Sequence, residues 1–298
     1  MKKKLVVALI SAAMVTSMLG ACGSSNASSS SASSTATSSV SASSASEEDT
    51  TAASSSVSAS SASEEVSADA DQEAADKVAA LIDAIYVQER NDNTDEQCKE
   101  AKEAWDALTD AQKELVEGEN ADPDYFGRDT GDASKDDPLN GDEIGENELL
   151  VVSFGTSFND SRAEDIGGVE KALQAAYPDW SVRRAFTAQI IINHVQARDG
   201  EKIDNMEQAL ERAVANGVKN LVVQPTHLMH GAEYDEMMEM VDSYRDKFES
   251  VAIAEPLLGE VGSDATVINA DKEAVAKAIT AEAVKTAGFD SLDAAAED

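Results

Sequence analysis

The feature that most constrains the fold is an alternation of short apolar runs with helical patterns from residue 148 onward. The apolar runs lie at residues 149–154, 182–186, 220–224 and 251–254. Helical patterns follow at 163–176, 190–195, 204–217, 233–248 and 272–287, and Asp204 with Glu207 is predicted to cap the third. This order predicts an α/β lobe over 148–298, with a parallel sheet, right-handed crossovers and helices on both faces.

The amino terminus carries an export signal. Lysines 2–4 precede an apolar run at residues 5–19 that is too short to span a membrane, which predicts a secretory signal over 1–21. The tract LGAC at 19–22 resembles the lipobox of bacterial lipoproteins, which implies a lipid on Cys22. We therefore expect an exported protein, lipid-anchored at the outer face of the cytoplasmic membrane or in the periplasm. Cys98 is the only other cysteine, so no intramolecular disulfide is predicted.

Two segments separate this signal from the α/β lobe. Residues 22–67 are rich in Ser and Ala and contain SSVSASSASEE twice, which predicts a disordered tether. Residues 68–118 have helical periodicity and two capping-box patterns, Thr94 with Gln97 and Thr109 with Gln112. We interpret them as a small all-α module, a spacer or interaction unit, whose inner face holds Trp105, Leu108 and Leu115.

Residues 119–147 predict a second linker. They combine prolines, glycines and many aspartates without apolar periodicity, and the aspartates at 129–137 lack the regular spacing of calcium loops. A solvated acidic linker is the favoured interpretation. The net charge of −35 argues against nucleic acid or anionic lipid as a partner, because polyanions would be repelled.

Polar loops follow the predicted strands, and the carboxyl ends of parallel strands share one edge where ligands bind. His227 and Glu233 lie six residues apart across a loop that contains Gly231, so both can be directed at one ligand. An imidazole beside a carboxylate suits proton transfer near neutral pH. The alternative is that His227 satisfies backbone groups at the strand end, while Glu233 is an acid favoured at a helix N-terminus.

The other histidines give weaker signals. His230 is three residues from His227, but two such ligands fall short of the three or four that zinc takes, so no metal site is predicted within this chain. His194 lies in a helical pattern and is interpreted as a surface or packing residue. The methionines of the tract are interpreted as core residues: Met229, Met237, Met238 and Met240.

Several motifs occur together in the lobe: LLVVSFGTS at 149–157, RAFT at 184–187, RDG at 198–200, THLMHGAEY at 226–234 and PLL at 256–258. In this order they resemble the amino-terminal lobe of the sirohydrochlorin cobaltochelatases of the anaerobic cobalamin pathway, the long, two-lobed class. The resemblance covers residue 148 to about residue 260. It implies a chelatase-like α/β fold and a metal chelatase (lyase) that inserts Co²⁺, its substrate metal, into sirohydrochlorin or a related tetrapyrrole.

The resemblance also implies roles for individual residues. Glu233 and His227 match residues of the family's pocket and are the expected catalytic pair, accepting protons that the macrocycle loses. The expected tetrapyrrole-binding residues are Ser153, Gly155, Thr156, Ser157, Arg184, Thr187 and His230. The family's metal-binding histidines belong to a second lobe, so the chain is expected to be incomplete at its carboxyl end and to lack the catalytic second lobe.

Two other functions stay open. One is a non-catalytic lipoprotein that binds haem or another tetrapyrrole, with His230 as an axial iron ligand. The other is a surface spacer whose α/β lobe is vestigial. A homo-oligomer is compatible with each of these functions.

Overall fold

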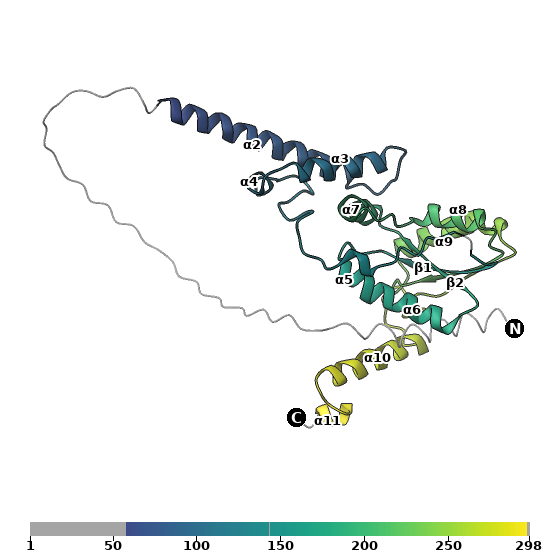
Figure 1. The fold of residues 1–298 in the computed structure, drawn as a ribbon. Coiled ribbons are helices and arrows are strands. Elements are labelled where there is room, and N and C mark those ends of the chain that lie inside the picture. The colour runs from purple at the N-terminus through teal and green to yellow at the C-terminus, as the bar shows by residue number, and fades with distance from the viewer. Residues whose placement is uncertain (1–57, 143, 297–298) are drawn as a thin grey trace, which may run out of the picture.

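The structure, a computed structural model, describes residues 58–142 and 144–296, with side chains from residue 68 onward. The predicted signal segment, Cys22 and the tether as far as residue 57 lie outside the described residues. Two folded units follow along the chain, a helical module and an α/β lobe (Figure 1). Within the described ranges, no helix combines the length and apolar character needed to cross a bilayer.

The lobe is built on a four-stranded parallel sheet. Its strands are β1 Asn147–Ser153, β2 Ser181–Phe186, β3 Asn220–Pro225 and β4 Ser250–Ile253. They lie in the order β2-β1-β3-β4, and each neighbouring pair is parallel. The bounds differ from the predicted strands by at most two residues. Strands β1 and β3 are mostly buried and apolar, whereas β4 is half-buried and β2 contains two arginines.

Helices cover both faces of this sheet, as predicted. Helices α8 Met206–Ala215 and α9 Ala232–Tyr244 pack on the face that holds Leu150, Val152, Leu221 and Val223. Helix α6 Gly167–Ala176 packs on the other face through Val169 and Leu173, against Leu149, Val151 and Val182. The alternation of side chains along each strand thus forms two apolar cores.

The helical elements of the lobe differ in detail from those predicted. A turn α5 Asn159–Ser161 and a π-helical segment η2 Arg162–Ile166 precede α6, and α7 Gln189–Asp199 follows β2. A 3₁₀ turn η3 Arg245–Lys247 follows α9. The predicted cap by Asp204 was wrong by one residue. Asn205 caps α8 reciprocally with Gln208, because Asp204 accepts hydrogen bonds from Arg212 instead.

The helical module comprises α2 Ser58–Ile85, α3 Thr94–Asp106 and α4 Asp110–Lys113. Helix α2 begins ten residues before the expected boundary at 68. The capping box of Thr109 with Gln112 is confirmed, whereas the Thr94 hydroxyl accepts from the Asn91 N–H and caps nothing. Trp105 and Leu108 are buried as predicted, but Leu115 is 38% exposed, and the neighbouring Val116 fills the core in its place.

The acidic segment 119–147 has little regular structure beyond a 3₁₀ turn, η1 Ala133–Lys135, yet it is not a solvated linker. Tyr125 and Phe126 join the core of the module, with Phe126 edge-on to Trp105. Asp136 is 1% exposed because it pairs with two arginines of the lobe. The prediction of a solvated linker was wrong because the partners of these side chains lie outside the segment. They are the core of the helical module and the arginines of the lobe.

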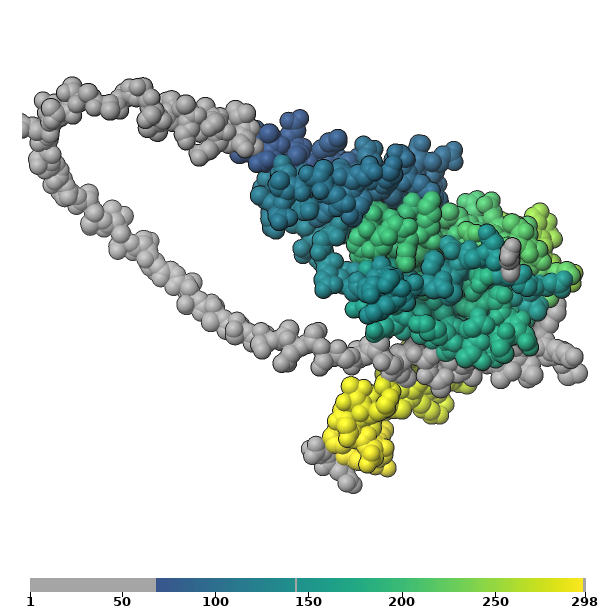
Figure 2. Space-filling view, viewed as in Figure 1, coloured from purple at the N-terminus to yellow at the C-terminus, as the bar shows by residue number. Residues whose placement is uncertain are grey.

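The helical module is docked on the lobe rather than held apart from it. Asn193 of α7 donates to the Ile85 carbonyl at 2.8 Å, and Gln196 donates to Asp95 at 2.8 Å. His194 lies between them and stacks on Tyr125 with 4.3 Å between ring centroids, so its predicted packing role is observed. The module rests directly against the lobe in Figure 2.

The last two helices are α10 Ala270–Thr286 and α11 Leu292–Ala296. None of their residues is buried. They project from the lobe at the lower part of Figure 1, and α10 adds no cover to the sheet.

Candidate functional site

The loops that follow the first three strands meet at one edge of the sheet, as expected for a parallel arrangement. The Thr187 N–H donates to the Ser153 carbonyl at 2.9 Å, and the Thr226 N–H donates to the Val152 carbonyl at 2.8 Å. The Ala188 N–H donates to the Phe154 carbonyl at 3.2 Å. These bonds extend the sheet into its loops and fix their backbones relative to one another.

His227 and Glu233, the predicted catalytic pair, are brought together. His227 Nε2 lies 3.6 Å from Glu233 Oε2, and the two side chains are 10% and 48% exposed. Gly231 ends the loop between them, and Glu233 occupies the first turn of α9, where the helix dipole favours an acid. Burial lowers the pKa of His227, and the charge of Glu233 opposes that shift only in part. A neutral imidazole therefore lies behind a partly exposed carboxylate.

Neither ring nitrogen of His227 has a hydrogen-bond partner within the described part of the chain. The alternative in which His227 satisfies backbone groups at the strand end is therefore not what its side chain does. Its backbone carbonyl does accept a bond, from the Leu257 N–H at 2.9 Å. A buried imidazole without partners is costly, so its site is suited to a proton donor or acceptor supplied by a ligand.

A cavity of about 340 Å³ opens beside this pair. Glu233 and Thr187 line it from the lobe, together with the amino-terminal turn of α8. The Thr187 hydroxyl is buried without a partner among the described residues. Glu233 thus stands between the cavity and His227, which is not among the lining residues.

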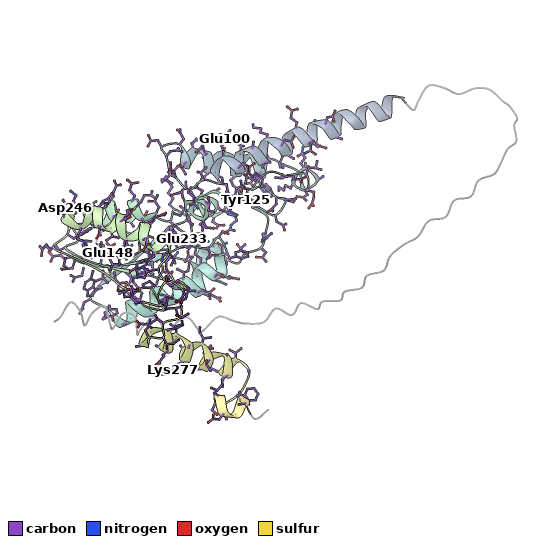
Figure 3. All side chains as sticks on the ribbon, turned by 180° about the vertical axis from the view of Figure 1, so that it is seen from behind. Glu100, Tyr125, Glu148, Glu233, Asp246 and Lys277 are labelled. Carbon is purple, nitrogen blue, oxygen red and sulfur yellow. The ribbon has the colours of Figure 1, made fainter. Side chains whose placement is uncertain are left out.

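The helical module supplies the opposite wall of this cavity, through Gln88, Glu89 and Arg90. The Gln88 side chain accepts from the Gln189 N–H at the first turn of α7 at 3.2 Å, and Arg90 pairs with Asp95. In Figure 3 Glu233 lies near the junction of module and lobe, with Tyr125 on the module side. No local sequence pattern indicates these residues, because the contact joins positions 101 apart in the chain.

The loop 153–157 is positioned at the same edge, but its side chains do not line this cavity. Gly155 has φ +102°, and a Cβ there would lie 2.5 Å from the Phe186 ring, so only glycine fits. The buried Ser153 hydroxyl accepts from Thr226 at 2.9 Å. The Thr156 hydroxyl accepts from the Phe158 N–H at 3.2 Å, and the Ser157 carbonyl accepts from Arg198 at 2.6 Å.

Aromatic side chains on the same loop were missed by the sequence analysis. Phe154 is 42% exposed and Phe158 is 45% exposed. Large exposed aromatic rings beside a strand-end loop suit contact with a flat apolar ligand face. The motif SFGTSF contains the signal, since an aromatic residue flanks the glycine turn on each side.

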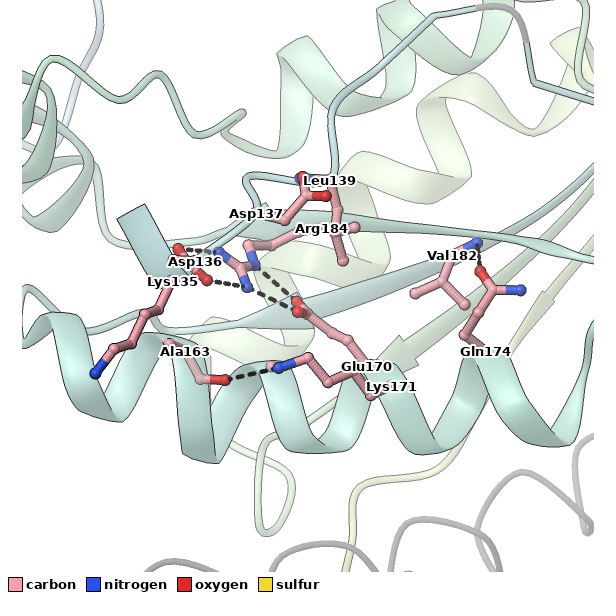
Figure 4. A pocket seen from close by; sticks show the side chains of 11 residues that line it. Lys135, Asp136, Asp137, Leu139, Ala163, Glu170, Lys171, Gln174, Val182 and Arg184 are labelled. Atoms are coloured by element: carbon pink, nitrogen blue, oxygen red, sulfur yellow. Dashed lines mark hydrogen bonds and ion pairs between the residues drawn. The ribbon is translucent and has the colours of Figure 1, made fainter. Parts of the chain in front are cut away.

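Arg184 is not a ligand-binding residue, and this expectation was wrong. Its guanidinium is 1% exposed and forms two bonds to Asp136, at 2.7 and 2.9 Å, and two to Glu170, both at 2.7 Å. Figure 4 shows it held between these carboxylates, next to α6, and it lines a hollow of about 190 Å³. Arg184 lies within β2 on the face that α6 covers, so its side chain never reaches the strand-end loops.

His230 lies in the same loop as His227 but faces a different set of side chains. Its Nε2 is 2.8 Å from Glu260 and 3.6 Å from Glu255, and its Nδ1 is 3.5 Å from Asp235. Burial alone would lower the pKa of His230, but Asp235, Glu260 and Glu255 together raise it. It does not line the cavity beside Glu233. Of the four methionines expected in the core, Met237 is buried, whereas Met229 and Met240 are exposed.

The fold and the site together define an α/β lobe of the chelatase type, with an imidazole beside a carboxylate at the carboxyl edge of a parallel sheet. Residues 147–290 match the family model described as cobalt chelatase (CbiK). The resemblance inferred from the motifs is therefore confirmed for this region, which is similar to the cobalt chelatase family.

Two curated proteins are similar to it. The sirohydrochlorin cobaltochelatase of Salmonella typhimurium is 39% identical over 110 residues, which are 37% of this chain and 42% of that protein. The sirohydrochlorin cobaltochelatase CbiKC of Nitratidesulfovibrio vulgaris is 27% identical over 116 residues, 38% of this chain and 40% of that protein. The match thus spans about two fifths of the length of each relative.

A solved structure, SirB from Bacillus subtilis with Fe3+, also aligns with the chain. The alignment covers 50% of this chain and 52% of that one, with 15% sequence identity and a TM-score of 0.34. At that score the alignment adds nothing to the sequence matches.

Proposed function

We propose that the α/β lobe acts in the insertion of Co²⁺ into sirohydrochlorin, and that Glu233 and His227 accept the protons that the macrocycle loses. The observation that carries the proposal is the pairing of these two side chains at 3.6 Å beside a cavity that Glu233 lines. The choice of reaction and of its two substrates, Co²⁺ and the tetrapyrrole, is supported by the similarity to proteins named sirohydrochlorin cobaltochelatase.

The geometry suggests an order for the two groups. Glu233 faces the cavity, so it is the direct acceptor of a ring N–H proton, and His227 is the next base behind it. Because burial keeps His227 neutral, its Nε2 can take the proton from Glu233 and restore the carboxylate. The exposed Phe154 and Phe158 are proposed to contact the macrocycle at the rim.

Kinetics of the purified chain test this proposal. The protein is mixed with sirohydrochlorin and Co²⁺ without oxygen, and the conversion of the macrocycle is followed by its absorbance. Loss of a general base is expected to slow the reaction by about 10²-fold or more in Glu233→Gln. His227→Ala should slow it less, because Glu233 still accepts the first proton and only the next base behind it is lost.

The matched control is Glu239→Gln, an exposed glutamate on the same helix that does not line the cavity. It should react at the parent rate. Equal rates for Glu233→Gln and Glu239→Gln would refute the assignment of Glu233. Absence of any cobalt-dependent change above the rate without protein would refute the proposed reaction for this chain.

We further propose that the protein is exported and held at the membrane by a lipid on Cys22. The support is the LGAC tract after a lysine-led apolar run. Fractionation of cells that express the parent and Cys22→Ser tests it. The variant should leave the membrane fraction, and equal retention of both proteins would contradict the anchor.

A second candidate, haem binding through His230, has weaker support. The imidazole is 37% exposed, as an axial ligand requires, but three carboxylates lie within 3.6 Å of its ring nitrogens. These acids would repel the propionates of haem. A haem absorbance shift that disappears in His230→Ala would favour this candidate.

A further inference from the structure

Three side chains at the carboxyl edge form a cluster that the proposed reaction does not use. His230 comes from the loop between β3 and α9, while Glu255 and Glu260 come from the segment after β4. His230 Nε2 lies 2.8 Å from Glu260 Oε1 and 3.6 Å from Glu255 Oε2. The ligand atoms of all three residues lie within 4.8 Å of one another.

The backbones that carry these side chains are tied together. The Leu257 N–H donates to the His227 carbonyl and the Leu258 N–H to the Leu228 carbonyl, both at 2.9 Å. The Asn269 side chain donates to the carbonyls of Leu258, at 2.8 Å, and Glu260, at 2.9 Å. The two loops therefore present the imidazole and both carboxylates from one joined scaffold.

The imidazole itself is oriented from two sides. Its ring stands against the Tyr234 ring, with centroids 4.4 Å apart at 70°, and the Tyr234 hydroxyl donates to the Ala254 carbonyl at 3.1 Å. Asp235 lies 3.5 Å from Nδ1, opposite the nitrogen that faces the two glutamates. A carboxylate behind the non-ligating nitrogen is the usual means of orienting a metal-binding histidine.

The charge of the cluster is unbalanced. Three carboxylates surround one imidazole, and no lysine or arginine of residues 68–296 forms an ion pair with any of them. A cation placed between Nε2 and the two glutamates would remove this imbalance. The distances from Nε2 to the two glutamates, 2.8 and 3.6 Å, are close to those in a metal site, because ligands bound at about 2.0–2.2 Å lie roughly 3–3.5 Å apart.

We propose that His230, Glu255 and Glu260 bind a divalent first-row transition metal ion, through one nitrogen and two carboxylate oxygens. An imidazole ligand favours such ions over Mg²⁺ and Ca²⁺, which take all-oxygen sites. Three protein ligands on an exposed edge leave coordination positions open to water, so the ion is exchangeable rather than structural. The inference stands apart from the proposed chelation, because it requires no tetrapyrrole.

Titration of the full chain, without a histidine tag and without sirohydrochlorin, tests the site. Calorimetry with Co²⁺ should show one saturable site per chain, and visible ligand-field absorption should report nitrogen and oxygen ligands. His230→Ala and the double variant Glu255→Gln, Glu260→Gln should each weaken binding by at least about tenfold. Mg²⁺ at the same concentration should not displace Co²⁺.

Two controls make the result specific. Glu239→Gln removes an exposed acid of α9 that is not part of the cluster, and this variant should bind Co²⁺ as the parent does. Glu233→Gln, which is expected to fail in chelation, should also bind Co²⁺ normally, so the two proposals can fail separately. Parent-like affinity in His230→Ala, or displacement by equimolar Mg²⁺, would show diffuse attraction to acidic side chains and overturn the site.

Discussion

Two charged clusters in the lobe differ in burial and in balance. Arg162, Arg184, Asp136 and Glu170 form a network in which every side chain is at most 3% exposed. His230, Glu255 and Glu260 form an open cluster whose members are 37–70% exposed. In the first, each carboxylate bonds to an arginine at 2.7 Å, whereas the second has an excess of acid.

The difference follows from the cost of removing a charge from water. A buried ion must be fully paired, since its desolvation costs several kcal/mol, so the network of Arg162, Arg184, Asp136 and Glu170 has a structural role. An exposed carboxylate keeps its hydration and tolerates an acidic neighbour. Burial therefore separates charge that holds the fold together from charge that is available to a ligand.

The largest expected effect comes from breaking the buried network. Arg184→Ala leaves Asp136 and Glu170 without their shared partner, and should lower the free energy of unfolding by about 3–5 kcal/mol. Urea unfolding followed by circular dichroism measures this change. Arg245→Ala is the control, because its pair with Asp242 is about half exposed and should contribute less than about 1 kcal/mol. Similar losses in both variants would mean that burial does not distinguish these ion pairs.

Acid should destabilise the contact between module and lobe through His194. Burial, and to a smaller extent the nearby Arg198, lower its pKa from 6.5 to about 4. The unfolded chain therefore binds a proton more readily between these values, so stability is complete above pH 6.5 and falls as the pH drops toward 4. We expect a loss of roughly 2 kcal/mol across that range, after allowing for the partial exposure of the ring.

His194→Phe provides the comparison for this pH dependence. It keeps an aromatic ring against Tyr125 and Phe126 but cannot take up a proton. The difference in unfolding free energy between parent and variant should grow as the pH falls from 6.5 to 4. A difference that stays constant over this range would contradict the role of His194 as the titrating group.

How far the sequence predicts this molecule depends on the distance over which each feature is encoded. The strands are local apolar runs, and His227 with Glu233 lie within one loop and helix turn, so both were predicted. Arg184 was misassigned because its partner Asp136 lies 48 residues earlier, in a segment with no apolar periodicity. Two other features were missed for the same reason. They are the cavity wall at Gln88–Arg90 and the cluster of His230 with Glu255 and Glu260, whose members are brought together only by tertiary packing.

Asp95 is intermediate between the two clusters, because it is exposed like the open cluster but paired like the buried network. It is 41% exposed, yet it pairs with Arg90 and Lys202 and accepts from Gln196, so it links the module to α7. Burial alone would raise the pKa of Asp95, but the bonds from Lys202, Gln196 and Arg90 hold it well below its usual range. Asp95→Asn should therefore lower the free energy of unfolding by about 1 kcal/mol, measured at neutral pH. A loss as large as that of Arg184→Ala would contradict the expectation that the stability contributed by an ion pair increases with its burial.

The smallest effect is expected in the open cluster. Glu255→Gln should change the free energy of unfolding by less than about 0.5 kcal/mol without metal, because the carboxylate is 51% exposed and lies in an acidic surrounding. With Co²⁺ at about 100 times its dissociation constant, the parent should gain about 2.7 kcal/mol, and the variant should lose most of this gain. Thermal unfolding with and without Co²⁺ measures both quantities. A large loss in the metal-free variant would instead give Glu255 a structural role, and the contrast between buried and open charge would no longer hold at this edge of the sheet.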